Sequence, residues 1–308
     1  MPLINHALNE AISVLPGACK KIAFHIINAG GKRLRPALVI LFGRMFGYTQ
    51  KDIYTLAITM ELLHAATLLH DDILDDANKR RGKACAHKVF GNVQSILTGD
   101  AMLALGNSIV SSFNKPELCS CFSHATMQTA TGEIQEMELL YNPLISEADY
   151  LAMITGKTAC LIADSCCLGC LAAGKDGQTL NNVYNFGENL GIAFQIIDDV
   201  LDFLPENKTG KPIGGDLKEG KLTPPIRFYR NSLEYNEKRE FDKKFVSAFY
   251  SGHTAEDLIL KIIPFAEQTR KYALGFLEKA RKNLSTFSDC HEKKLLEEIL
   301  NQAERRTF

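Results

Sequence analysis

The chain has 308 residues, with 35 Lys and Arg against 36 Asp and Glu, so its formal net charge at pH 7 is only −1. This even balance argues against a nucleic-acid partner, because general nucleic-acid binders carry a basic surplus or a basic face. Hydrophobic residues make up 46% and charged residues 23%, a composition that is typical of a globular protein and excludes a disordered one.

Neither a membrane span nor a signal peptide is predicted. The longest apolar run, residues 158–174, contains Asp164 and is too short for a tilted span. The N-terminus has no basic region, and Glu10 and Pro16 interrupt its apolar stretch. The nine cysteines are an odd number, and without a secretory signal they indicate reduced thiols. We therefore expect a cytoplasmic protein.

Helical periodicity extends through almost the whole chain. Apolar residues recur at i, i+3, i+4 and i+7 over 53–69 and again over 262–276. Period-2 alternation and a βαβ rhythm are both missing from the sequence. Gly and Pro breaks divide the chain into segments of about 15–30 residues, and no linker separates them. We predict one all-α domain over residues 1–308, a single large bundle of about ten helices.

The first chemically informative segment is GGKRLRP at residues 30–36. It places Lys32, Arg33 and Arg35 at a glycine turn that leads into a helix, with Pro36 near the first turn. Cations at a helix N-terminus oppose the macrodipole. The arrangement is favourable if a polyanion lies among them, because the helix N-terminus and the cations then act together on phosphate.

Two acidic clusters form a partial repeat, HDDILD at 70–75 and IDDVLD at 197–202. Asp71 and Asp75 are four residues apart, as are Asp198 and Asp202, so each pair lies on one helix face about 6 Å apart along the axis. Apolar residues precede and interrupt both clusters. Carboxylates in such helices are costly unless a cation compensates.

Mg²⁺ suits these clusters because it binds a few carboxylates together with waters and substrate phosphates. The alternative, a pair of solvated acidic patches at helix N-termini, fits less well with Asp residues inside an apolar pattern. Basic residues follow each cluster: Arg80 and Arg81 after the first, and Lys211 and Lys221 around a Gly-rich loop after the second. Together these residues predict a cavity for two anionic substrates.

A CxxC pair, Cys167 and Cys170, lies between the two clusters, with Cys160 and Cys166 nearby. A zinc or redox site is one interpretation. We favour small side chains buried in a helix, because free cysteine is among the most buried residue types and no second ligand pair at finger-like spacing follows.

Taken together, these segments resemble trans-prenyl diphosphate synthases. The resemblance rests on GGKRLRP at 30–36, HDDILDDANKRRG at 70–82, GD at 99–100, GE at 132–133, KTA at 157–159, FQIIDDVLDF at 194–203 and GKPIGGDLKEGK at 210–221. It implies an isoprenoid synthase fold of long helices around a central apolar cavity, usually in a homodimer. It also implies Mg²⁺-dependent condensation of isopentenyl diphosphate with an allylic diphosphate such as farnesyl diphosphate.

The resemblance also assigns metal ligands. Asp71 and Asp75 would bind two Mg²⁺ ions on the allylic diphosphate, and Asp198 would bind a third. The remaining carboxylates of the two clusters would assist, namely Asp72, Asp199 and Asp202.

Other positions match residues that hold the two diphosphates in this family. Contacts to the allylic diphosphate would come from Arg80, Lys157, Lys211 and Lys221. Isopentenyl diphosphate would be held by Lys32, Arg35, His64 and Arg81. For His64, a purely structural hydrogen-bonding role is the alternative. Thr158 and Gln195 would face the developing carbocation, and the reaction requires no nucleophilic side chain.

Two positions depart from the family pattern. Glu136 stands where many relatives have Gln, and Pro224–Pro225 replaces the commoner Leu-Pro. We expect only local differences in geometry at both positions.

Small side chains precede the first acidic cluster and suggest a long product. Ala66 and Thr67 lie five and four positions before Asp71, where relatives that make fifteen- or twenty-carbon products often have an aromatic residue. The growing tail is expected to pass them and to continue past Leu63 and Met60. Met102, Leu103 and Leu161 are candidates for the floor of the tunnel. We predict products above twenty carbons; early closure by a facing side chain is the alternative, as in a short-chain farnesyl or geranylgeranyl diphosphate synthase.

Two further functions compete with this interpretation. A class I terpene cyclase would share one acidic cluster but would not need the GGKRLRP element, and its second metal motif usually differs. A non-catalytic subunit of a heteromeric synthase would have lost Asp residues that are intact here. The catalytic half of a heteromer remains compatible with the sequence.

Overall fold

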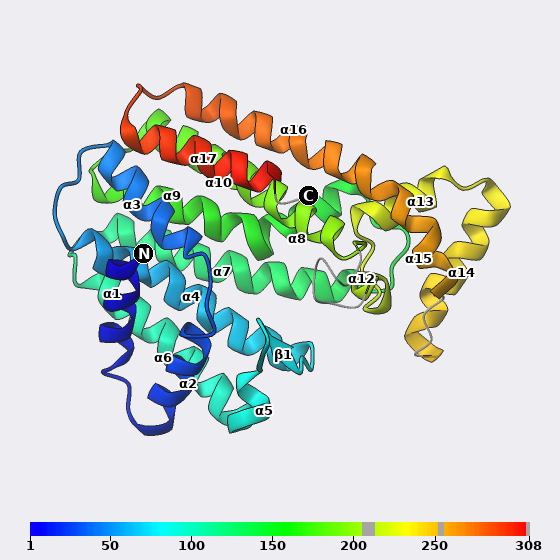
Figure 1. Ribbon diagram of the computed structural model, residues 1–308, viewed down its shortest axis with the longest axis horizontal. Helices are drawn as coiled ribbons and strands as arrows, with labels where there is room; N and C mark the ends of the chain where they lie inside the picture. Colours follow the sequence, from blue (N-terminus) through cyan, green and yellow to red (C-terminus); the bar gives the residue numbers. More distant parts are fainter. Residues whose placement is uncertain (205–212, 252–255, 306–308) are drawn as a thin grey trace. The chain divides into compact units, whose positions relative to one another are not determined.

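A computed structural model describes residues 1–204, 213–251 and 256–305 (Figure 1). The all-α prediction is confirmed, because the regular elements of these residues are helices apart from one short hairpin. In chain order the elements are α1 (Pro2–Ile12), α2 (Gly17–Ile27), α3 (Leu34–Met45), α4 (Ile53–Leu74), β1 (Lys79–Arg80), β2 (Lys83–Ala84), α5 (Ala86–Phe90), α6 (Asn92–Ser111), α7 (Pro116–Leu139), α8 (Glu147–Ile154), the π-helix η1 (Thr155–Ala159), α9 (Cys160–Ala172), α10 (Gly177–Leu201), α12 (Gly215–Lys218), α13 (Pro224–Ser232), α14 (Tyr235–Ser251), α15 (Glu256–Ile262), the 3₁₀ helix η2 (Ile263–Phe265), α16 (Ala266–Ser285) and α17 (His291–Arg305).

The described residues contain more helices than the ten or so that the sequence predicted, mainly because several helices are short. Helices α5, α12, α13 and α15 have four to nine residues, too few to show a helical period in the sequence. The hairpin was also not predicted, since each of its strands has two residues. Its antiparallel pairing places Arg80 opposite Lys83.

The chain divides into two compact units, and each is described by itself. The first contains residues 1–126, 164–184 and 289–293, and the second contains residues 127–163, 185–288 and 294–308. The prediction of one domain over residues 1–308 stays a prediction.

Helix α4 is the central element of the first unit. It packs against α1, α3 and α6, and side chains on all of its faces are buried in the middle of the helix, as expected for a helix that is apolar all round. Leu8, Ile58, Leu62 and Met102 belong to the resulting core, which joins α1, α4 and α6. The first acidic cluster is thus attached to a rigid helix.

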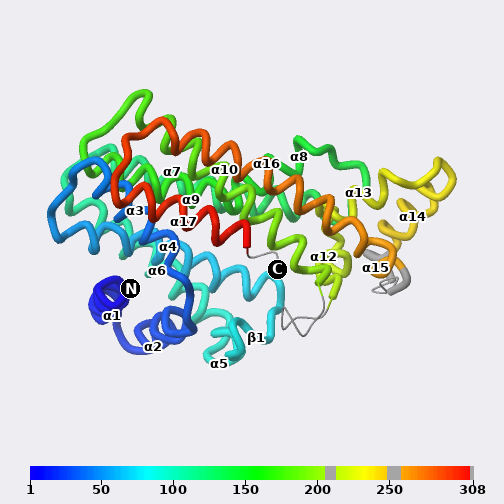
Figure 2. Tube along the Cα trace, turned by 45° about the horizontal axis from the view of Figure 1, so that its top comes forward, coloured from blue at the N-terminus to red at the C-terminus, as the bar shows by residue number. Residues whose placement is uncertain are grey.

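Aromatic side chains dominate the core of the second unit. The Tyr229 ring meets Phe241 and Phe265 edge to face, with ring centroids 5.8 and 5.9 Å apart. At the C-terminal end of the chain, α16 and α17 lie side by side (Figure 2), where Arg281 donates to Asn301 and Glu304 at 2.9 and 2.7 Å.

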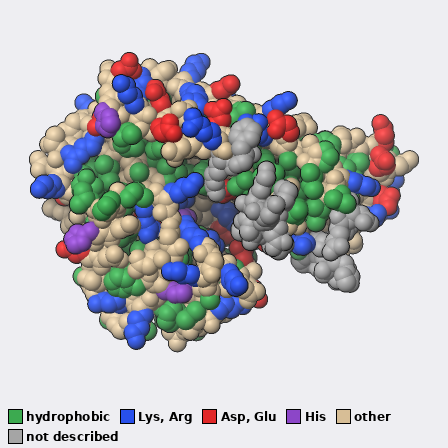
Figure 3. All heavy atoms as spheres, in the orientation of Figure 1, with side chains coloured by type: hydrophobic (Ala, Val, Ile, Leu, Met, Phe, Trp, Pro, Cys, Tyr) green, Lys and Arg blue, Asp and Glu red, His purple; other side chains and the backbone are tan. Residues whose placement is uncertain are grey.

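Two segments are long and apolar enough to cross a membrane by length and composition alone, Ile53–Leu74 and Glu147–Ala172. The second exceeds the apolar run seen in the sequence, because α8 and η1 continue into α9 without a break. In both segments most of the apolar window is buried inside the structure, 67% and 72% respectively, as expected of core helices. On the face shown in Figure 3, acidic and basic side chains are interspersed.

The cysteines are all free. Cys166, Cys167 and Cys170 are buried in α9, and burial raises the pKa of each thiol. Their environment agrees with the interpretation of the CxxC pair as small core side chains.

Candidate active site

The first acidic cluster occupies the C-terminal turn of α4. Asp71 and Asp72 are in the last turn, and Asp75 is the C-cap, its backbone amide bonded to the Asp71 carbonyl at 2.9 Å. Asp72 is buried and accepts a 2.7 Å bond from Arg80 Nε. Three carboxylates at a helix C-terminus are unfavourable, because that end carries partial negative charge. A cation bound there would remove this penalty.

The β1–β2 hairpin brings Arg81 back to the GGKRLRP segment within the first unit. Arg81 and Gly82 form its turn with φ of 51° and 78°, the left-handed conformation that two-residue hairpin turns favour. The Arg81 guanidinium covers Gly31, where an added Cβ would lie only 2.8 Å from Nη1. A glycine at position 31 therefore permits this close approach.

Arg35, His64 and Arg81 form a basic cluster in the first unit, because Arg35 and Arg81 interact electrostatically with each other and with His64. Burial lowers the pKa of Arg35 to about 10, and burial also lowers that of Arg81. Burial, together with Arg35 and Arg81, lowers the pKa of His64 well below 6.5, so its imidazole is neutral at pH 7. The buried Arg35 Nε has no hydrogen-bond partner among the described residues. Clustered like charges with an unused donor are expected where an anion binds.

Arg33 has a different role from its neighbours. It is only 7% exposed, and its guanidinium donates to Glu61 at 2.7 Å, to the Ile27 carbonyl at 2.6 Å and to Asn5 at 3.2 Å. Lys32, in contrast, is exposed. Arg33 therefore holds the loop in place, while Lys32 and Arg35 remain candidates for a ligand.

The three predicted chain-length residues lie on α4 before the first cluster. Leu63 and Ala66 are fully buried, and Ala66 belongs to the same core as Met102. Thr67 is partly exposed and donates to the His64 carbonyl at 2.9 Å. Two of the predicted floor residues, Met102 and Leu103, contribute to this core.

The second acidic cluster likewise lies at the C-terminus of a helix, at the end of α10 in the second unit. Asp199 accepts a 2.5 Å bond from the Tyr150 hydroxyl and a 3.0 Å bond from Gln195 Nε2. Burial and the neighbouring Asp198 raise its pKa to about 7 although the two hydrogen bonds lower it. Its charge is thus poorly compensated, again at a helix C-terminus.

Asp202 follows the last residue of α10, and Asp216 lies in the short helix α12. The carboxylate oxygens of Asp202 accept bonds from the amides of Gly215 and Asp216 at 3.1 and 3.0 Å, which fixes the start of α12. Burial, with Asp199 and Asp202, raises the pKa of Asp216, and its Oδ2 is buried without a hydrogen-bond partner among the described residues. An oxygen donor set with an unused buried oxygen fits a hard divalent cation such as Mg²⁺.

A π-helical turn positions Lys157 and Thr158. Gly132 of α7 lies so close to this turn that a Cβ on it would come within 2.5 Å of the Gly156 carbonyl carbon and closer still to the Lys157 amide. Such π-turns are frequent at functional sites. The Thr158 hydroxyl donates to Gln195 Oε1 at 2.8 Å, so the predicted pair is joined directly.

Lys157 and Lys221 are surrounded by carboxylates. Lys157 Nζ lies 3.0 Å from Glu133 and also bonds to Glu136, while Lys221 Nζ lies 3.6 Å from Glu136 and 2.7 Å from Glu219. These carboxylates raise the pKa of both lysines although burial lowers it. Lys211 lies outside the described residues.

A cavity that is open to solvent lies in the second unit. One part of its lining is polar: Glu136, Lys157, Gln195, Asp199, Asp216, Lys221 and Thr223. The remainder is mostly apolar: Leu139, Leu140, Ile145, Tyr150, Met153, Ile154 and Leu222. The cavity therefore combines an apolar wall with a polar end that carries both acidic and basic side chains.

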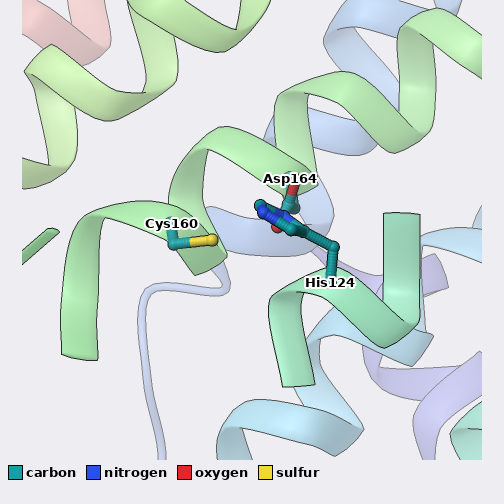
Figure 4. A group of neighbouring side chains, drawn as sticks. All are labelled: His124, Cys160 and Asp164. Atoms are coloured by element: carbon teal, nitrogen blue, oxygen red, sulfur yellow. The ribbon is translucent and has the colours of Figure 1, made fainter. Parts of the chain in front are cut away.

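A separate polar contact is found on α7 and α9. His124 Nδ1 and Asp164 Oδ2 are 2.8 Å apart (Figure 4), and Cys160 lies one turn before Asp164 on α9. The ion pair satisfies the buried Asp164 carboxylate.

Residues 16–259 match the family model described as Polyprenyl synthetase. The chain belongs to the polyprenyl synthetase family. It is therefore a prenyltransferase of the all-α isoprenoid synthase fold, as the motifs predicted.

Proteins named hepta-, octa- and decaprenyl diphosphate synthase are similar to this protein in sequence or in structure. Heptaprenyl diphosphate synthase component 2 of Bacillus subtilis is 34% identical over 92% of this chain and 81% of that protein. Octaprenyl diphosphate synthase of Escherichia coli is 36% identical over 72% of this chain and 69% of that protein. The crystal structure of decaprenyl diphosphate synthase from Rhodobacter capsulatus has a TM-score of 0.92 and 29% identity, covering 100% of this chain and 96% of that one.

Sequence reasoning missed several polar residues of the candidate site. The sequence did not indicate a role for Tyr150, because a lone tyrosine in an apolar helix usually packs in the core. Asp216 lies inside the GGDLKEG segment and was detectable as a third acidic position. Glu133 and Glu136 were seen only as motif residues, since nothing in the sequence indicates that they pair with Lys157 and Lys221.

Proposed function

We propose that the chain condenses isopentenyl diphosphate with an allylic diphosphate in a Mg²⁺-dependent reaction and builds an all-trans polyprenyl diphosphate longer than twenty carbons. One observation supports this most: α4 and α10 both end in a cluster of Asp side chains, where the helix dipole disfavours negative charge. The basic cluster of Arg35, His64 and Arg81 would provide a site for the second anion.

The metal ligands of the proposal are the two acidic clusters. Asp71 and Asp75 would hold two ions with help from Asp72, and Asp198 would hold a third with help from Asp199. Asp202 would assist as well, and its carboxylate accepts two backbone amides at the start of α12. Bound Mg²⁺ supplies Lewis-acid stabilisation of the negative charge on the departing diphosphate.

The basic residues bind and orient the two substrates. Arg80, Lys157, Lys211 and Lys221 would contact the allylic diphosphate and compensate the charge that it gains when its C–O bond breaks. Isopentenyl diphosphate would be held by Lys32, Arg35, His64 and Arg81. His64 is neutral, so it donates one N–H to the phosphate oxygen without adding charge.

Thr158 and Gln195 provide oxygen dipoles for the allylic cation. Their mutual hydrogen bond and the bond from Gln195 to Asp199 fix the orientation of the amide. The double bond of isopentenyl diphosphate then attacks the cation, a new C–C bond forms, and the proton that is lost passes to the departing diphosphate. The apolar part of the cavity lining would limit the contact of the cation with water.

The assembly of the proposed enzyme is a dimer. Val89, Val93, Ile96 and Leu97 are all exposed, from 41% to 65%, between the end of α5 and the first turns of α6, and contiguous apolar residues on a surface mark interaction sites. A homodimer is the expected form. The name of the Bacillus subtilis relative, a component 2, makes a heteromer the alternative, and a cytoplasmic location stays a prediction.

The metal assignment is tested by Asp71→Ala and Asp198→Ala. We expect both variants to lose condensation at ordinary Mg²⁺ concentrations while their helical circular dichroism stays near wild type, since each removes a carboxylate at a helix end. Initial rates with isopentenyl and farnesyl diphosphate measure this. Turnover close to wild type in either variant would refute the assignment.

A further inference from the structure

Glu136 is a carboxylate in the part of the cavity where the proposed function requires phosphate-binding cations. It lies on α7, one turn after Glu133, so both side chains are on the same helix face. The family resemblance leads us to expect Gln at this position, and the chain instead carries a group with the same charge sign as the substrate.

The contacts of Glu136 are with the two lysines that would bind the allylic diphosphate. Its carboxylate bonds to Lys157 Nζ and lies 3.6 Å from Lys221 Nζ. The side chains are well shielded from solvent, with exposures of 13%, 22% and 18% for Glu136, Lys157 and Lys221. Shielding makes these charge interactions stronger than those of surface pairs.

Each lysine keeps another acidic partner apart from Glu136. Glu133 lies 3.0 Å from Lys157, and Glu219 lies 2.7 Å from Lys221. The position of each ammonium group is therefore secured without Glu136. What Glu136 adds is negative charge between the two lysines, so that two ammonium groups face three carboxylates.

We propose that Glu136 is an internal competitor of the diphosphate, which holds Lys157 and Lys221 while no diphosphate is bound and takes them back when inorganic diphosphate leaves. This inference rests on the proposed function, in which both lysines contact the allylic diphosphate. A diphosphate brings several negative charges into the cluster, so the lysines must exchange one anionic partner for another. The exchange lowers diphosphate affinity and speeds product release.

The first experiment measures the affinity for inorganic diphosphate with Mg²⁺ by titration calorimetry. Glu136→Gln keeps the size of the side chain and removes its charge, and we expect its dissociation constant to fall about tenfold, or about 1.4 kcal/mol. Glu136→Ala is a second variant with the same expected direction. Glu136→Asp keeps the charge and should stay within about twofold of wild type. Glu219→Gln is the matched control: Glu219 is 53% exposed, so its screened charge should change the affinity at most about twofold.

The second experiment separates the chemical step from release. Glu136→Gln should lower the KM for the allylic diphosphate and lower steady-state kcat, while the single-turnover rate stays at the wild-type value. If Glu136 had only a structural role, Glu136→Gln would lower the single-turnover rate as well. A single-turnover rate that falls in step with kcat would therefore contradict the proposal.

Lys157→Ala and Lys221→Ala test the assignment of the two lysines separately from the competitor role of Glu136. If both lose diphosphate affinity while Glu136→Gln and Glu136→Ala bind as wild type or more weakly, the competitor role is wrong and the proposed function stands. If the lysine variants bind diphosphate normally, the assignment of these lysines fails and the inference fails with it.

Discussion

Arginines that are close together in the sequence have different roles in this protein. Arg33 lies at φ of 50°, in the left-handed region, and this conformation directs its side chain to Glu61 and Asn5. Arg35, two residues later, keeps a buried donor without a hydrogen-bond partner among the described residues. The run of cations was visible in the sequence, but the hydrogen bonds that bury Arg33 depend on contacts with distant residues, which a local pattern does not record.

The buried imidazole of His64 predicts a pH dependence of stability. Its pKa is well below 6.5 in the folded protein, whereas in the unfolded chain it is near 6.5. The unfolded state therefore binds more protons as the pH falls through this range, and stability present above about pH 6.5 is lost below it. We expect the Tm of wild type to fall more between pH 7.5 and 5.5 than that of His64→Gln.

Thermal unfolding of both proteins at a series of pH values measures this difference. Equal slopes in wild type and variant would show that His64 does not titrate differently in the two states. His6, which is exposed on α1, offers a matched control, because His6→Gln should leave the slope unchanged.

The helices could be predicted from the sequence, but the irregular turn between α8 and α9 could not. The positions of the two Asp clusters and of the GGKRLRP turn followed from period and motif. The π-helix at Lys157 did not, and it lies against Gly132 of α7, a contact between residues that are separated in the sequence. The ion pairs of Glu136 and the Tyr150–Asp199 bond depend in the same way on contacts that no local pattern records.

The π-helix makes Gly132 a sensitive position. A Cβ at Gly132 would collide with the backbone of Gly156 and Lys157, and overpacking against backbone costs about 1–3 kcal/mol. We expect Gly132→Ala to lower the free energy of unfolding by this amount and to reduce activity by displacing Lys157 and Thr158. Chemical denaturation and steady-state kinetics measure the two effects.

Gly275→Ala is the matched control for this prediction. Gly275 lies inside α16 with no atom within 4 Å of an added Cβ, so alanine there should stabilise the protein by up to about 1 kcal/mol. If both variants behave alike, the close approach at Gly132 has no energetic consequence.

We predict that Ala66 and Thr67, on α4 before the first acidic cluster, control product length. Ala66→Phe adds bulk at a fully buried position beside the proposed tail path, and Thr67→Phe does so at a partly exposed one. We expect products to shorten towards fifteen or twenty carbons in both variants, because a bulky side chain closes the path early. Product analysis by mass spectrometry and a parallel measurement of Tm distinguish shortening from loss of the fold. Unchanged product lengths in both folded variants would mean that the tail does not pass this face.

Several motifs of the whole molecule lie at helix ends. Helices α4 and α10 end in acidic clusters, and the turn before α3 carries Lys32 and Arg33. Other motifs lie inside helices, such as GD at 99–100 in α6 and GE at 132–133 in α7. The membership of the polyprenyl synthetase family was predictable because all of these motifs are short local segments, which a single sequence shows directly.

Product length is the property that the family name leaves open. Some solved structures similar to this chain have long-chain titles, and another, with a TM-score of 0.87 and 32% identity, is titled geranylgeranyl pyrophosphate synthase. We propose that this chain, by itself, makes products above twenty carbons.

The most direct test incubates the purified chain alone with isopentenyl diphosphate, farnesyl diphosphate and Mg²⁺ and determines the lengths of the products by mass spectrometry. We predict polyprenyl diphosphates longer than twenty carbons, and none when Mg²⁺ is removed with a chelator. Products that stop at twenty carbons or fewer, or no product without a second subunit, would contradict the account.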